Sequence, residues 1–305
     1  MDYLYILIAD VLLAVVFTCN KVYQKRVGDG IKVGLAASVI MGCVSFVIFF
    51  ALSGFDLQIT PYSMIMATLM MLAVTSYSLL AYKILSSGKV AIYVMFLMSG
   101  GMVLPYVWGL IFGGESFSIL RTMGLLVIMA SVVLINFDKT KPSKMQIILC
   151  IFVFILNGCS SIISKTHQDP VTILARLGIS RSFEIVDTAS FVALVNLAKI
   201  VICLALYIVV SLALRKAEPN LLPYKKGNVL LPILAVSAAA VADGVSYYFQ
   251  LLGAKSLDAG LLYPLISGGS IIVTALAAFF AFREKPSRPA LVGIILCIGG
   301  MCFFI

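Results

Sequence analysis

"LISGGSIIV", residues 265–273, places two glycines side by side inside a long apolar run, and the same Ser-Gly-Gly recurs in "FLMSGGMVL", residues 96–104. Glycine weakens a helix interior by roughly 1 kcal/mol relative to alanine, so its repetition needs a reason. Residues 86–114 align with 254–282 at an offset of 168, with further identities at Ala91/Ala259, Leu97/Leu265 and Phe112/Phe280. At an offset of 169, three more identical pairs follow: Glu115/Glu284, Ser118/Ser287 and Gly124/Gly293. The chain therefore contains two copies of one unit.

The composition places these units in a membrane. Of 305 residues, 62% are hydrophobic and 11% are charged, against about 25% charged residues in soluble domains. The mean hydropathy is +1.12. The first apolar segment lacks a small-residue cleavage site, so we expect a retained helix. Both units therefore belong to an all-α, multi-pass integral membrane protein, whose bacterial plasma-membrane location is a further expectation.

Ten segments have the ~20 mostly apolar residues that a spanning helix needs. They are residues 3–24, 32–53, 62–83, 89–112, 118–137, 145–165, 188–214, 229–252, 257–282 and 288–305. Residues 1–138 and 145–305 form two five-helix repeats, joined by a polar linker at 139–144. Since five is odd, the second copy enters the membrane from the opposite side, which gives inverted repeats. This plan is typical of secondary transporters, and the alternative is a duplicated bundle without a transport role.

The repeats resemble a known family. Small residues open segments 89–112 and 257–282, a glutamate ends each, and a glycine-bearing helix follows, as in "AKSLDAGLLYPLISGGSIIVTALAAFFAFREKPSRPALVGI". This pattern resembles the EamA repeat of the drug/metabolite transporter superfamily. The resemblance implies ten helices in two inverted repeats, a cavity between them, and export or exchange of a small metabolite without ATP hydrolysis. The matching positions are Ser99, Gly100, Gly101, Glu115, Gly124, Ser267, Gly268, Gly269, Glu284 and Gly293.

Ionisable and polar residues inside a bilayer are costly, so each is a functional candidate. Asp243, Tyr247 and Gln250 share one helix face, which predicts a lining for a polar or cationic ligand. Asp243 is also expected to pair with Lys199 as a structural alternative. Asp10 is the third candidate for ion coupling or an ion pair.

Further candidates come from the other helices. Asn157 is expected either to bind substrate or to make helix–helix hydrogen bonds. The cavity is also expected to include Tyr77, Tyr93, Tyr263, Ser99 and Ser267. Packing or hinge roles are expected for Gly100, Gly101, Gly268, Gly269 and Pro264, since glycine pairs permit close helix contact or a bend. The single histidine, His167, is predicted to be a solvated loop residue.

No motif for bond chemistry is present: the sequence lacks a Walker A motif and HExxH. The seven cysteines form no CxxC pair, which indicates packing residues. We therefore expect no enzymatic activity, cofactor or metal. The net charge of +9 is attributed to basic loops that orient the protein in the membrane, and we expect no nucleic-acid binding. An intramembrane enzyme using Asp10 and Asp243, and a receptor or scaffold, are the remote alternatives.

The sequence therefore predicts a secondary transporter of a small polar metabolite or drug-like solute, with export favoured. Uptake or exchange of sugar- or nucleotide-linked solutes is the alternative, which the two deep acids and one lysine disfavour. The expected partners are the solute, the bilayer, and a proton or another coupling ion; a monomer suffices and a dimer is an alternative. Lysines and arginines number sixteen in the loops after odd-numbered segments and five in the others, which predicts both termini outside.

Overall fold

The computed structural model describes residues 2–28, 30–85, 90–136, 142–179, 183–213, 230–283 and 286–304, and every regular element in these ranges is a helix. The elements are α1 (Asp2–Val27), α2 (Ile31–Leu52), α3 (Pro61–Leu85), α4 (Val90–Trp108), the π-helical turn η1 (Gly109–Gly113), α5 (Ile119–Ile135), α6 (Lys144–Gln168), α7 (Pro170–Arg176), α8 (Thr188–Ala213), α9 (Leu230–Ser256), α10 (Ala259–Phe282), α11 (Arg288–Met301) and the 3-10 turn η2 (Cys302–Phe304).

Eight of these helices are long and apolar enough to cross a membrane: α1, α2, α3, α4 with η1, α6, α8, α9 and α10. The chain is therefore a multi-pass membrane protein. Apolar helices α5 and α11 are shorter than this length. Each of the ten predicted segments contains one helix, and α7 is an additional element.

The segment after residue 165 was predicted to be a loop, but its first residues are helical. Helix α6 continues to Gln168, and α7 follows with Pro170 at its start. The continuation occurs because residues 164–168 are all buried, so this polar turn packs inside the protein. Some predicted positions lie outside the described residues. They are the segment boundaries at 89, 137, 214, 229 and 305, the linker residues 139–141, and Glu284.

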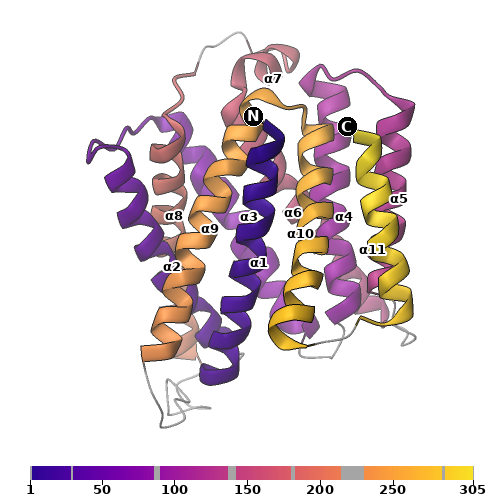
Figure 1. Ribbon diagram of the computed structural model, residues 1–305. Coiled ribbons are helices and arrows are strands. Elements are labelled where there is room, and N and C mark those ends of the chain that lie inside the picture. The colour runs from indigo at the N-terminus through magenta and orange to yellow at the C-terminus, as the bar shows by residue number, and fades with distance from the viewer. Residues whose placement is uncertain are drawn as a thin grey trace.

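The helices form one bundle in which helices from the first half pack against helices from the second (Figure 1). Helix α1 packs against α9 and α10, and α6 packs against α3 and α4. Further contacts join α2 with α8, α5 with α11, α4 with α10, α3 with α8 and α2 with α9.

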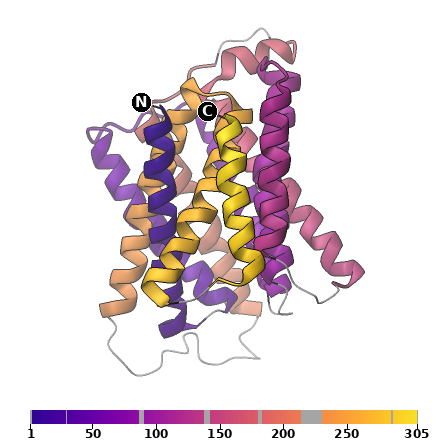
Figure 2. The same cartoon turned by 45° about the vertical axis from the view of Figure 1, so that its right-hand side comes forward.

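Both chain ends lie at the same end of the bundle, as Figures 1 and 2 show. We call this the terminal end; it also holds residues 53–60, 114–118 and 257–258. The opposite end, where α1 ends at Val27 and α2 begins at Ile31, is the distal end. These names locate each contact below.

The glycine pairs occupy points of close helix contact. A Cβ at Gly100 would lie 2.7 Å from Cα of Phe154 on α6, and one at Gly268 would lie 3.2 Å from Sδ of Met301 on α11. Gly269 leaves room for the carboxyl of Asp10 on α1. The packing role is thus visible in the contacts, whereas the hinge role stays a prediction.

Candidate functional site

A cavity of about 310 Å³ lies between the two halves. It is lined from α1, α3, α4, α6, α8, α9 and α10 by Leu13, Phe17, Met70, Met71, Val74, Tyr77, Leu97, Met98, Gly101, Asn157, Ser160, Ser161, Ser164, Val195, Asn196, Lys199, Asp243, Gly244, Tyr247, Gln250, Leu251, Tyr263, Ile266, Ser267 and Ser270. This volume is in the range of small-molecule sites. The wall combines apolar side chains with several hydroxyl and amide groups, which suits a small polar solute.

An ion pair occupies one wall of this cavity. Lys199 Nζ on α8 lies 3.1 Å from Asp243 Oδ2 on α9. Their side chains are 15% and 34% exposed, respectively, so the pair faces open space instead of being sealed in the core. These two are the only charged side chains in the lining that the structure describes. The cavity wall therefore carries no net charge.

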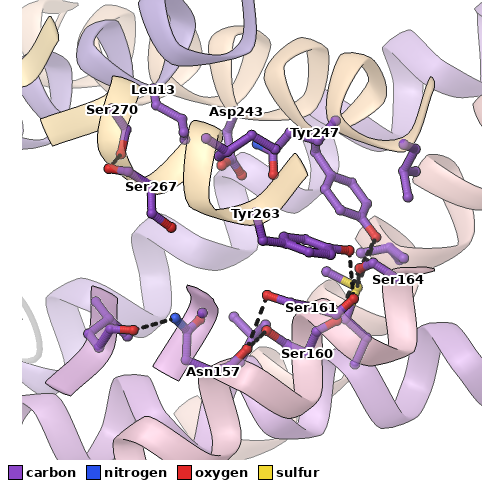
Figure 3. A pocket seen from close by; sticks show the side chains of 18 of the residues that line it. Leu13, Asn157, Ser160, Ser161, Ser164, Asp243, Tyr247, Tyr263, Ser267 and Ser270 are labelled. Carbon is purple, nitrogen blue, oxygen red and sulfur yellow. Dashed lines mark hydrogen bonds between the residues drawn. The ribbon is translucent and has the colours of Figure 1, made fainter. Parts of the chain in front are cut away.

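Two tyrosines reach across the cavity from the second half's α9 and α10 to α6 (Figure 3). Tyr247 OH lies 3.0 Å from Ser164 Oγ and donates to Met70 Sδ on α3 at 3.0 Å. Tyr263 OH donates to the backbone carbonyl of Ser161 at 2.6 Å. The tyrosines thus connect four helices at the site: α3, α6, α9 and α10.

Four further predicted residues line the cavity, and two of them make defined hydrogen bonds. Asn157 Nδ2 donates to the carbonyl of Leu97 on α4 at 2.7 Å, so its amide joins the two halves (Figure 3). Gln250 Nε2 donates to Ser246 Oγ at 3.1 Å, one turn back along α9. Tyr77 and Ser267 also belong to the lining. Substrate contact by any of them stays a prediction.

Other predicted residues lie elsewhere. Tyr93 packs in an apolar cluster with Ile84, Cys150 and Val153. Ser99, Gly100, Gly268, Gly269 and Pro264 are absent from the described lining, although Gly101 belongs to it. Helical periodicity explains this separation, because neighbours along a helix point about 100° apart and only one stripe of α4 or α10 faces the cavity.

Asp10 is separated from the ion pair. It is 2% exposed, its Oδ2 rests against Gly269 of α10, and Oδ1 has no hydrogen-bond partner among the residues that the structure describes. Asp10 is therefore not the ion-pair partner of Lys199, which pairs with Asp243. Asp10 lies instead against Gly269 of α10, which does not belong to the described cavity lining.

The prediction for His167 is wrong. Its side chain is 0% exposed and stacks on Phe191 of α8 with ring centroids 3.5 Å apart. Nε2 lies 2.9 Å from Ser63 Oγ on α3. The imidazole is buried because α6 extends past residue 165, so His167 belongs to the core of the terminal end.

The sequence reasoning also missed lining residues. Asn196 lies three residues before Lys199 on the same face of α8, and Ser164 and Met70 hold the Tyr247 hydroxyl. The i, i+3 spacing to Lys199 was the available signal for Asn196. In the described ranges, no three His, Cys, Asp or Glu side chains gather where they could hold a metal ion.

Two smaller cavities continue from this site towards the distal end. One, of about 150 Å³, shares Met71, Val74 and Lys199 with the main cavity. The next, also about 150 Å³, shares Gly34, Ser38 and Tyr82 with that one and includes Gln24 and Gly28 near the end of α1. The three cavities form a series from the ion pair towards the distal end.

Comparisons with known proteins support the fold only. No family model matches the chain, and no curated protein does. Solved structures do resemble it: one, described only as "Crystal structure of protein", has a TM-score of 0.73 at 14% sequence identity over 99% of this chain and 95% of its own. At this identity the match shows a shared fold across nearly the whole chain.

Proposed function

We propose that this protein is a secondary transporter of a small polar solute, of the EamA type within the drug/metabolite transporter superfamily, with export favoured. The observation that carries the proposal is the cavity between the two halves, with the Lys199–Asp243 pair in its wall. Ionisable residues at membrane depth mark substrate or ion pathways. The solute would bind here and leave by alternating access.

Helix pairing supports the repeat on which alternating access depends. Suppose that α1 to α5 of the first half correspond in order to α6, α8, α9, α10 and α11 of the second half. Replacing each helix by its counterpart then converts the packed pair α1–α9 into α6–α3. In the same way, it converts α4–α6 into α10–α1 and α3–α8 into α9–α2. All of these pairs are in contact. The pairs α2–α8, α4–α10 and α5–α11 map onto themselves. This supports two inverted five-helix repeats and hence a total of ten crossings, with α5 and α11 as the short pair.

The chemistry of the wall narrows the solute class. Because the charges of Lys199 and Asp243 cancel, a solute with a net charge would leave that charge uncompensated in a poorly hydrated site. Tyrosine, serine and asparagine groups offer hydrogen bonds around it. These features favour a neutral or zwitterionic solute over a nucleotide-linked one, which carries several negative charges.

The distribution of charge supports an orientation. The loops predicted to be basic are those at the distal end, which the proposal places in the cytoplasm of a bacterial plasma membrane. At the terminal end, Lys165 is buried and donates to the carbonyls of Ala254 and Leu257, which leaves fewer free cations there. We expect a C-terminal alkaline phosphatase fusion to be active; an inactive fusion would contradict this orientation.

A binding screen tests the proposal without a guess at the solute. Purified wild-type protein is heated with each member of a metabolite library, and we expect at least one neutral or zwitterionic compound to raise the Tm. Asp243→Asn should lose that shift, whereas Asp56→Asn, in an exposed loop, should keep it. A compound that stabilises wild type and Asp243→Asn equally would remove the ion pair from the binding site.

A further inference from the structure

Glu115, which follows η1 in the first half, lies on the first turn of α10 in the second half. The backbone N–H of Ala259 donates to Oε1 at 2.5 Å, and that of Gly260 donates to Oε2 at 2.9 Å. The first N–H groups of a helix have no acceptor within the helix, and a helix N-terminus attracts negative charge. Each carboxylate oxygen of Glu115 therefore satisfies one otherwise unpaired donor across the boundary between halves.

Three glycines leave the space that the Glu115 carboxylate occupies. A Cβ at Gly260 would lie 2.8 Å from Glu115 Oε2, and a Cβ at Gly109 would collide with the same carboxylate. Gly114, with φ at +77°, turns the chain so that the N–H of Glu115 donates to the carbonyl of Gly109 at 3.1 Å. The backbone is thus shaped around the Glu115 side chain.

Charged groups surround the contact. Arg121 Nη1 on α5 lies 2.7 Å from Asp258 Oδ2, which directly precedes α10. Lys165 Nζ on α6 donates to the carbonyls of Ala254 and Leu257 at 2.8 and 2.9 Å. Burial raises the pKa of Glu115 and Asp258 adds to the rise, while the Gly260 and Ala259 N–H groups and Lys165 oppose it. The two backbone N–H groups therefore offset part of the cost of burying this carboxylate.

This contact lies on the terminal side of the cavity. Tyr263, three residues beyond Gly260 on α10, lines the cavity and bonds to Ser161. The first turn of α10, held by Glu115, thus lies between the cavity and the terminal end. Towards the distal end, the two smaller cavities continue from Lys199.

We propose that Glu115 is an inter-half latch: it holds the N-terminus of α10 against the first half while the cavity faces the distal end, and it must release that helix before the cavity faces the terminal end. This inference rests on the proposed alternating access. It assigns a gating role to a residue outside the cavity. In the structure Glu115 is bonded to α10, and the two smaller cavities continue from the main cavity towards the distal end.

The test compares full-length Glu115→Ala with Glu184→Ala, which removes an exposed glutamate at the same end. Both carry Ser267→Cys as a reporter in the cavity. The proteins are placed in sealed liposomes, and a membrane-impermeant thiol reagent is added outside. Protease removal of a C-terminal tag gives the fraction whose terminal end faces outward, and mass spectrometry of the α10 peptide measures labelling of the reporter.

We expect Glu115→Ala to increase labelling from the terminal side at least fivefold over Glu184→Ala, and to speed hydrogen exchange at the amides of residues 259 and 260. Glu115→Gln, which keeps one acceptor, should fall between them and provides the test if the alanine variant fails to fold. Faster exchange without increased labelling would reduce Glu115 to a helix cap and overturn the latch. Because no solute is needed, this failure is distinct from a failure of the transport proposal.

Discussion

The two ends of the bundle differ in how the halves meet. At the terminal end, polar side chains join them: Glu115 to the start of α10, Arg121 to Asp258, and His167 to Ser63. Towards the distal end, two cavities of about 150 Å³ each lie among α1, α2, α3 and α8. An apolar bundle alone would not favour either end. The proposed closure of the terminal end predicts that substitutions there cost more stability than substitutions beside the small cavities.

The largest effect is expected at the terminal end. His167→Ala removes a fully buried ring stacked on Phe191 and its hydrogen bond with Ser63, so the free energy of unfolding should fall by about 3 kcal/mol. Phe117→Ala, at the same end with a side chain 66% exposed, is the matched control and should change little. Chemical denaturation of both variants in detergent measures the difference, and equal losses would show that the terminal end is not specially packed.

A smaller effect is expected towards the distal end. In Gly34→Ala the new Cβ would collide with the Tyr82 hydroxyl, which borders both small cavities. Overpacking destabilises a core by about 1–3 kcal/mol, while alanine stabilises a helix by about 1 kcal/mol relative to glycine. We therefore expect the free energy of unfolding to fall by about 1 kcal/mol.

Gly299→Ala provides the control for that substitution, because nothing lies within 4 Å of its Cβ position on α11. This variant should be as stable as wild type or slightly more stable. If Gly34→Ala is equally harmless, the Tyr82 side chain moves aside without cost, and the close contact between Gly34 and Tyr82 does not stabilise the fold.

The smallest effect is expected from Arg121→Ala. Its ion pair with Asp258 is close at 2.7 Å, but the side chains are 29% and 46% exposed, and such pairs contribute about 0–1 kcal/mol. The loss should shrink as salt is raised, since exposed charges are screened. A loss above 2 kcal/mol that does not respond to salt would mean that Arg121, and not Glu115, carries the closure.

The sequence predicted the helices well because apolar runs of ~20 residues leave the backbone little choice in a membrane. It also grouped Asp243, Tyr247 and Gln250 on one face from spacing alone. It did not predict the Glu115 contact with α10, because that contact joins residues 144 apart whose pairing depends on how the halves dock. The burial of His167 was missed for a related reason. A polar stretch of sequence predicts an exposed loop, and only the packing against α3 and α8 shows that it is buried.

The central claim is that the cavity beside Asp243 carries a solute across the membrane, and counterflow tests it most directly. Liposomes holding purified protein are preloaded with the solute found by thermal shift, and entry of a trace of labelled solute is followed. We predict rapid counterflow with wild type and at least tenfold slower counterflow with Asp243→Asn, at equal protein content. Equal rates for the two at every pH would remove Asp243 from the mechanism, and no counterflow with wild type would contradict transport itself.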